Sequence, residues 1–354
     1  MRRDRKPEGA ESTGRQGAAP VTIALGGDTM LGRMVGQALR SRRPATVWTP
    51  ELLGVFDEAD VAIVNLECCI SERGEPWEPG RKPFHFRAPP RALEALTAAG
   101  IRAVWLANNH ALDFGPIALL DTFEHLERAG IAWTGAGVDL EMARRGTTIR
   151  VGGLTVGLVG FADHPADFAA GTDTPGIAYT ALAREGPPGW LLDEVRALAK
   201  HCDVVIAGPH WGPNMNPSPL PHHPAVARAL ADAGADALAG HSAHVFQPVD
   251  VVSGAAICYD LGDLLDDYQV DPVLRNDLGL LALLRPRERL QLVPLKLDFA
   301  QTTLARGDDH AWVVERVVDG CRRRGTDVQL EGERLSIALT GPPSRGSSSE
   351  SRKA

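Results

Sequence analysis

Short apolar runs alternate with amphipathic segments along most of the chain, which predicts a succession of strands and helices. Runs typical of buried strands lie at 21–25, 61–64, 102–106, 155–161, 203–207, 236–239 and 256–259. Segments with helical character lie between several of them, at 31–40, 91–99, 116–128, 191–200 and 224–233. Strands that alternate with helices predict an α/β protein with a largely parallel sheet and crossover helices on its faces.

The last third of the chain has a different pattern. The runs 278–284 and 289–299 predict a hairpin, followed by a helix at 310–323 and a strand at 334–339. This pattern predicts a second sheet or an antiparallel extension of the first one. Because no linker or internal repeat interrupts the succession of strands and helices, we expect residues 20–340 to form a single domain. The ends, 1–19 and 341–354, are polar and low in apolar residues, and we expect them to be disordered.

Composition narrows the class of protein. Of 354 residues 44% are hydrophobic and 23% charged, which is typical of a globular chain. The net charge of −8 argues against a general nucleic-acid binder. Five cysteines without a CxxC pair predict reduced thiols and a cytoplasmic location. No apolar run approaches the roughly 18 residues that a membrane helix needs, so we expect no membrane anchor and no secretory signal.

Side chains that can coordinate metal ions follow several of the predicted strands. They are Asp28, Glu67, Asn109 with His110, His210, and His241 with His244. Because loops beyond the carboxyl ends of strands line the ligand site in open α/β sheets, we expect these side chains to converge. Nitrogen and oxygen donors without thiolates suit Zn²⁺, Mn²⁺ or Fe²⁺. The alternatives are a turn or helix-capping role for Asp28, a turn role for Asn109, a hydrogen-bonded position partly in the core for His110 and a packing role for His210.

Six motifs appear in order between residues 21 and 270. They are Gly27–Arg33 (GDTMLGR), Asn65–Glu67 (NLE), Ala107–Gly115 (ANNHALDFG), His210–Gly212 (HWG), Gly240–Gln247 (GHSAHVFQ) and Tyr259–Asp263 (YDLGD). Together they resemble the CapA (poly-γ-glutamate capsule synthesis) family, which is similar to calcineurin-like metallophosphoesterases. The resemblance implies a four-layer αββα sandwich with a dinuclear metal centre between its sheets.

The resemblance also implies roles for individual residues. Asp28 and His244 would bind one divalent ion, and Asn109, His210 and His241 the other. Glu67 would bridge the two ions, which could be Mn, Zn or Fe. His110 would act as a general acid rather than as a ligand, braced by Asp113. Arg33 and Gln247 would hold a substrate anion.

Some positions depart from the family pattern or stay outside it. Met30 replaces a histidine that metallophosphoesterases usually have there, and Pro213–Met215 lacks a glutamate that CapA relatives often carry. His222 and His223 are interpreted as surface or helix-start residues. His85, His125, His164, His201 and His310 have no partner at ligand spacing. Asp263, Asp266 and Asp267 are either acidic neighbours of the site or part of a solvated loop.

The resemblance implies a metal-dependent hydrolase or transferase linked to poly-γ-glutamate, capsule or related peptide metabolism. Its substrate would be a phosphoester, an amide-linked glutamate chain or another peptide or small molecule. One alternative is a metal-dependent peptide epimerase, in which Asp28 and His244 or His110 exchange the α-proton. The alternative from another class is a non-catalytic capsule-assembly component that holds metal without turnover.

Overall fold

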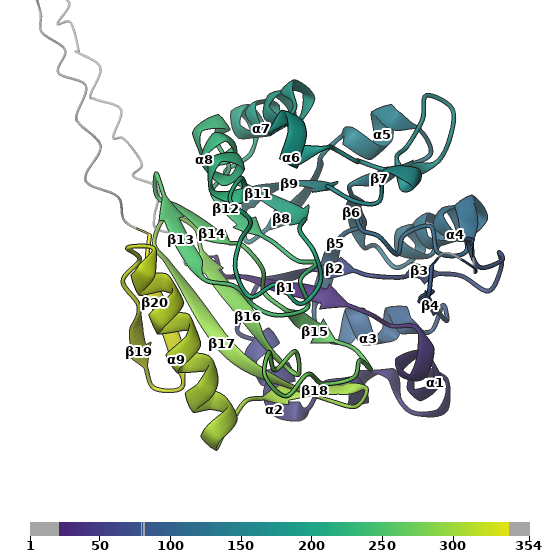
Figure 1. Cartoon of the computed structure of the whole chain (residues 1–354). Coiled ribbons are helices and arrows are strands. Elements are labelled where there is room, and N and C mark those ends of the chain that lie inside the picture. Colours follow the sequence, from purple (N-terminus) through teal and green to yellow (C-terminus); the bar gives the residue numbers. More distant parts are fainter. Residues whose placement is uncertain (1–20, 79, 81, 340–354) are drawn as a thin grey trace, which may run out of the picture.

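The computed structural model describes residues 21–78, 80 and 82–339 (Figure 1). The two ends that we expect to be disordered lie outside these residues. No helix in the described ranges is long and apolar enough to span a membrane.

The first sheet is built around strand β1. On one side of it, β2, β5 and β6 run parallel to β1, and on the other side β16, β17, β20 and β19 continue the sheet in antiparallel order. Two further strands join this sheet: β15 pairs with β1 and β18 pairs with β17. The bounds are β1 (Ile23–Thr29), β2 (Val61–Leu66), β5 (Ile101–Trp105), β6 (Ala132–Thr134), β15 (Asp263–Leu265), β16 (Leu278–Arg285), β17 (Arg289–Asp298), β18 (Gln301–Leu304), β19 (Gln329–Glu331) and β20 (Arg334–Ala338). The C-terminal hairpin is therefore an antiparallel extension of the first sheet.

The second sheet has the strand order β13-β14-β12-β11-β9-β8, with parallel strands in the middle and an antiparallel strand at each edge. Its strands are β8 (Thr147–Val151), β9 (Leu154–Ala162), β11 (Val204–His210), β12 (Ala237–Ala239), β13 (Val249–Val252) and β14 (Ala255–Cys258). Two short pairs lie outside both sheets: β3 (Cys69–Ile70) with β4 (Arg87–Ala88), and β7 (Ala136–Gly137) with β10 (Gly176–Ile177).

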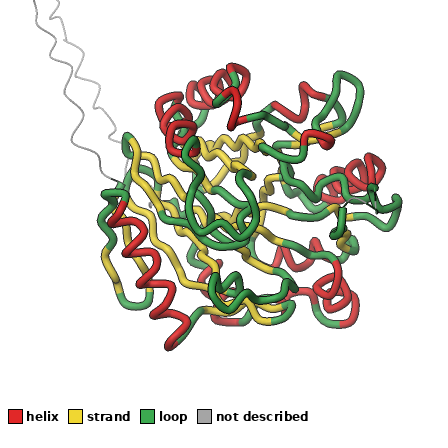
Figure 2. The backbone as a smooth tube through the Cα atoms, in the orientation of Figure 1, coloured by secondary structure: helices red, strands yellow, loops and turns green. Residues whose placement is uncertain are grey.

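Helices lie on the outer faces of both sheets (Figures 1 and 2). The first sheet is covered by α1 (Arg33–Ser41), α2 (Pro50–Phe56), α3 (Ala92–Ala98) and α4 (Gly115–Arg128), with a 3-10 turn, η1, at Pro44–Val47. The second is covered by α5 (Leu140–Arg144), α6 (Leu182–Glu185), α7 (Gly189–His201) and α8 (His223–Ala233). A second 3-10 turn, η2, spans Ala166–Phe168.

Three apolar cores separate these layers. One lies between each sheet and its own helices, and the third lies between the two sheets, where Leu25 and Ile63 of the first meet Ile206 of the second. Helix α9 (Gly307–Arg323) contributes Val313 and other apolar side chains to this central core. The arrangement helix–sheet–sheet–helix confirms the expected four-layer αββα sandwich.

Candidate metal centre

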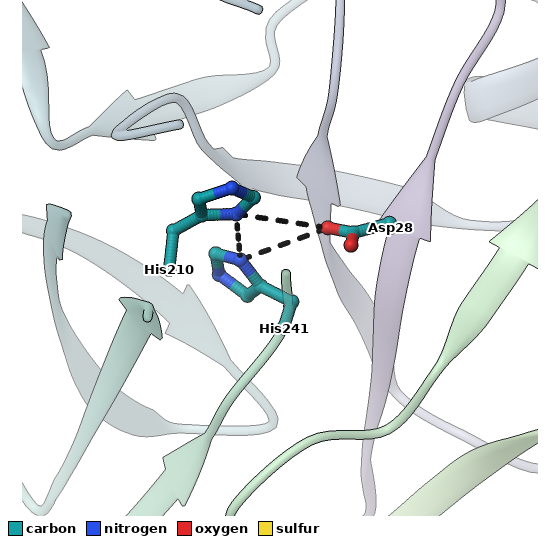
Figure 3. A group of neighbouring side chains, drawn as sticks. All are labelled: Asp28, His210 and His241. Atoms are coloured by element: carbon teal, nitrogen blue, oxygen red, sulfur yellow. Dashed lines mark hydrogen bonds and ion pairs between the residues drawn. The ribbon is translucent and has the colours of Figure 1, made fainter. Parts of the chain in front are cut away.

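The candidate site lies where strands of the two sheets end next to each other. Asp28 belongs to β1 and Glu67 directly follows β2, whereas His210 ends β11 and both His241 and His244 follow β12. Their exposed fractions lie between 0% and 6%. Figure 3 shows Asp28 of the first sheet facing His210 and His241 of the second. The tertiary structure thus brings together side chains that are up to 216 residues apart, from Asp28 to His244.

Asp28 and the two histidines form the first group. His210 Nδ1 and His241 Nδ1 are 2.8 Å apart and lie 3.9 and 3.7 Å from Asp28 Oδ1. Burial lowers the pKa of His241 to about 4. Burial, together with the repulsion that a protonated His241 would exert, holds the pKa of His210 well below its ordinary value. Both imidazoles are therefore neutral near pH 7, which is the form that binds metals. Their Nε2 atoms are buried and have no hydrogen-bond partner among the described residues.

His244 and three carboxylates form the second group. His244 Nδ1 lies 3.4 Å from Asp28 Oδ2 and 2.8 Å from Asp263 Oδ1, and its Nε2 lies 3.9 Å from Glu67 Oε1. Burial and the charge of Asp28 raise the pKa of Glu67 well above its ordinary value. Burial alone would lower the pKa of His244, but the charges of Asp263 and Glu67 outweigh it and raise that pKa. The group holds more negative charge than one imidazolium balances.

Asp28 is common to both groups, because its two oxygens face different neighbours. Oδ1 accepts a hydrogen bond from Asn65 Nδ2 at 2.6 Å, and Oδ2 accepts one from the main-chain N of Ser242 at 3.0 Å. The resemblance assigns the bridging role to Glu67. In the structure Asp28 belongs to both groups and Glu67 to the second group only. The bridging role of Glu67 stays a prediction.

His110 and Asp113 form a buried pair beside this centre. His110 Nδ1 lies 2.5 Å from Asp113 Oδ2, which also accepts a hydrogen bond from the main-chain N of Phe86. The Phe86 ring stacks on the His110 ring at 3.8 Å. Burial outweighs the charge of Asp113 and lowers the pKa of His110 to about 4. Asp113 braces His110 as expected, and the segment around Phe86 packs over the site.

Of the remaining expected residues, Asn109 and Arg33 lie beside residues of the centre, whereas Gln247 lines a cleft next to α9. Asn109 is partly buried, and its Oδ1 has no partner among the described residues, whereas its main-chain O accepts a hydrogen bond from Lys82. Arg33 begins α1 and forms an ion pair with Asp267 at 3.2 Å. Gln247 is buried, and its Nε2 donates to the main-chain O of Asn216. None of these contacts occupies Asn109 Oδ1, which stays free to coordinate a cation.

The structure adds residues that the sequence patterns left aside. Asp263, Asp266 and Asp267 are at most 7% exposed, so the solvated-loop interpretation is wrong. Tyr268, which no motif contains, donates a hydrogen bond from its hydroxyl to Glu67 Oε2 at 3.2 Å. The YDLGD motif, which ends at Asp263, and the acidic residues after it were the signals in the sequence that pointed to this loop.

The structure shows the surroundings of three other histidines. His164 has no partner at ligand spacing in the sequence, and in the structure its Nδ1 lies 2.5 Å from Asp163 Oδ1 and its ring 5.2 Å from that of His210. His222 and His223 stand at the start of α8 as expected, but His223 is buried and stacks on Trp211 at 4.1 Å. The surface interpretation of His223 is therefore wrong.

A comparison with protein families and curated proteins identifies relatives of this chain. The family model described as "Bacterial capsule synthesis protein PGA_cap" matches residues 22–268. The chain belongs to this family. A "Probable polyglutamine synthesis accessory protein" of Mycobacterium tuberculosis is 33% identical over 365 residues, which cover 89% of this chain and 95% of that protein. The "PGA biosynthesis protein CapA" of Bacillus subtilis is 28% identical over 68% of this chain and 62% of that protein.

Solved structures with a partial likeness are more distant. A hypothetical protein from Thermus thermophilus is 15% identical, with a TM-score of 0.42, over 80% of this chain and 96% of the other. A 5′-nucleotidase from Candida albicans is 13% identical, with a TM-score of 0.41, over 79% of this chain and 48% of the other. Membership of the capsule synthesis family therefore rests on the sequence matches.

Proposed function

We propose that this chain is a metal-dependent hydrolase or transferase that acts on polyglutamate or a related peptide. The observation that carries the proposal is a set of buried ligand atoms without hydrogen-bond partners among the described residues: Glu67 Oε1, Asn109 Oδ1, His210 Nε2, His241 Nε2 and Asp263 Oδ2. Leaving such atoms unpaired is costly unless they bind a ligand. The names of the relatives, which refer to polyglutamine synthesis and PGA biosynthesis, support the substrate class.

The donor set fits divalent cations. Asp28, His210 and His241 supply nitrogen and oxygen donors on one side, and Asp28, Glu67, His244 and Asp263 do so on the other. This chemistry suits Zn²⁺, Mn²⁺ or Fe²⁺. A bound cation would also compensate the crowded carboxylates that raise the pKa of Glu67. When bound, a pair of such ions supplies Lewis-acid chemistry: it acidifies water and polarises a substrate oxygen.

The residues of the chain would then orient the substrate and move protons. Asp113 holds the His110 ring through Nδ1 and leaves Nε2 as the atom that can exchange a proton with substrate. Because burial lowers the pKa of His110 to about 4, the ring is neutral at pH 7 and is not in the protonated form that a general acid needs. A substrate anion beside Nε2 would raise this pKa and allow His110 to act as the general acid. The guanidinium of Arg33 would hold such an anion.

The test measures metal content and turnover in the same preparations. We expect the native protein to hold up to about two divalent ions per chain, as in dinuclear sites. His241→Ala and Glu67→Ala should lose metal and lose Mn²⁺-dependent release of glutamate or phosphate from a panel of glutamyl peptides and phosphoesters. His201→Ala, on the exposed side of α7, is the matched control and should retain both.

Three results would contradict the proposal in different ways. Unchanged metal content in both variants would show that the cluster is not a metal centre. Metal binding without release, but with solvent deuterium entering a peptide α-carbon, would identify a proton-exchange enzyme instead. Metal binding with neither reaction across the panel would support a non-catalytic assembly role.

A further inference from the structure

A cleft of about 430 Å³ lies beside α9, outside the candidate metal centre. Its walls are the loop Pro217–Pro219, the segment Phe246–Pro248 and one face of α9. The floor is tightly closed, because a Cβ atom added to Gly320 of α9 would lie 2.7 Å from the Pro248 ring. The helix and the segment are therefore packed in direct contact at this point of the cleft.

The charged residues that line the cleft all carry the same sign. They are Arg316, Arg323 and Arg324, and no carboxylate is among the lining residues. Asp319 and Asp250, which do not line the cleft, balance Arg323 and Arg324, so the surplus positive charge of the lining is that of Arg316. It favours an anionic ligand.

Arg316 is the arginine that is open to such a ligand. Arg323 pairs with Asp319, and Arg324 binds Asp250 at 2.7 Å. The guanidinium of Arg316 lies 4.9 Å from the Trp312 ring and 5.9 Å from the Phe246 ring, and among the described residues it has no carboxylate partner within ion-pair distance. Burial and the charge of Arg323 lower the pKa of Arg316, so a bound anion would stabilise its charged form.

The cleft also offers a hydrogen-bond acceptor. Gln247 lines it, and Gln247 Oε1 is buried without a partner among the described residues. The amide is held in place because Nε2 donates to the main-chain O of Asn216. A ligand that complements both features carries carboxylates for the arginines and an N–H donor for Oε1. Inorganic phosphate at neutral pH can donate only from the O–H of one compact group, whereas a peptide has an N–H at most residues and can reach Oε1 and the arginines together.

The spacing of the arginines favours an extended ligand. Arg316 and Arg323 are seven residues apart on α9, or about 10 Å along the helix axis. An extended peptide advances by about 3.3 Å per residue, so carboxylates two to four residues apart match this distance. We propose that the cleft binds an acidic peptide segment with at least two carboxylates. The proposal is independent of any metal chemistry at Asp28.

Binding of a fluorescently labelled hexaglutamate peptide to the full-length protein, measured by anisotropy at low salt, tests the proposal. Arg316→Gln should weaken binding by about tenfold or more, as expected for the loss of a hydrogen bond to a charged group. Arg316→Gln combined with Arg323→Gln should weaken it further. Arg322→Gln removes the same charge from an exposed position of the same helix that does not line the cleft, and should change affinity by less than about twofold.

Further measurements identify the class of ligand and the site at which it binds. Hexaglutamine, which lacks side-chain carboxylates, should not bind. Inorganic phosphate at the same concentration as the peptide should not displace bound hexaglutamate, and displacement would overturn the assignment of a peptide ligand. Glu67→Ala should leave the effect of Arg316→Gln unchanged, because the part of the affinity that comes from the cleft does not involve the metal centre. If Glu67→Ala loses binding and Arg316→Gln keeps it, the peptide binds at the metal centre and the cleft proposal is wrong. Melting temperatures check folding, and the exposed single variant Arg323→Gln provides the test if Arg316→Gln does not fold.

Discussion

Asp28 carries two carboxylate oxygens that face different neighbours, and its pKa shows how burial and charge compete at the site. Burial would raise this pKa, but the hydrogen bond and charge of His244 outweigh burial and lower it. Glu67, without an equally close cation, has its pKa raised instead. Two carboxylates in the same buried space thus differ because one of them lies beside an imidazolium.

His223 shows the same competition outside the metal centre. Its pKa is lowered to about 4, first by burial and then by the charge of His222. Since an exposed histidine in the unfolded chain titrates near 6.5, the unfolded state takes up a proton first as the pH falls. The neutral ring therefore contributes stability above about pH 6.5 that is lost as the pH falls toward 4.

We expect His223→Phe, which keeps a ring stacked on Trp211, to remove this dependence. The difference in unfolding free energy between pH 7 and pH 5 should shrink by about 2 kcal/mol relative to the native protein. Urea unfolding at the two pH values measures it. An unchanged difference would mean that His223 is protonated without cost in the folded chain.

Strand β1 depends on close approach of its neighbours. A Cβ atom on Gly27 would lie 1.8 Å from the main-chain O of Gly262, and the next residue, Asp28, pairs in register with Asp263 of β15. The absence of a side chain at Gly27 therefore allows β15 to bring Asp263 next to the metal centre. The register shift between β1 and β2 falls at the same place, between Gly26 and Asp28.

We expect Gly27→Ala to destabilise the protein by about 1–3 kcal/mol or more, because the added methyl group forces two strands apart. Gly54→Ala is the control, and it should change stability in the opposite direction. Gly54 lies on the exposed side of α2 with no atom near its added Cβ, so alanine should stabilise the helix by about 0.5–1 kcal/mol. Denaturant unfolding compares the two variants. Equal effects of the two substitutions would contradict the close approach at Gly27.

The types of the central strands and helices were largely predictable from the sequence, whereas the edge strands of the sheets were not. The strand expected at 61–64 is β2, and the helix expected at 116–128 is α4, with boundaries that differ by at most two residues at either end. The edge strands β8 and β13 and the short helix α2 were not expected. Long apolar runs are buried on both faces and are visible in the sequence, whereas edge strands are half-exposed and their pattern is weak.

At the scale of the whole molecule, the candidate metal centre joins the two sheets. Asp28 and Glu67 come from the first sheet, and His210 and His241 come from the second. These residues lie close together only when the two sheets are packed in the folded chain. An ion that binds residues from both sheets therefore stabilises the folded state by mass action. The site is therefore coupled to the packing between the sheets.

We expect chelation of metal to lower the melting temperature by several degrees, since saturation at one hundred times the dissociation constant contributes about 2.7 kcal/mol. Added Mn²⁺ or Zn²⁺ should restore it in the native protein and not in His241→Ala. Differential scanning calorimetry measures both. Restoration in His241→Ala would show that the ion binds elsewhere.

The sequence by itself determined the alternation of elements, the antiparallel end and the identity of the side chains at the strand ends. These features are local: apolar periodicity and short ordered motifs are legible without knowing what packs against them. The tertiary structure decided that Asp28 rather than Glu67 is shared by both groups, that Asp263 and Tyr268 join the centre, and that three arginines line one cleft. Those outcomes depend on which oxygen, ring or guanidinium faces which neighbour across two sheets. Side-chain direction between distant segments is fixed by packing, and spacing along the chain does not encode it.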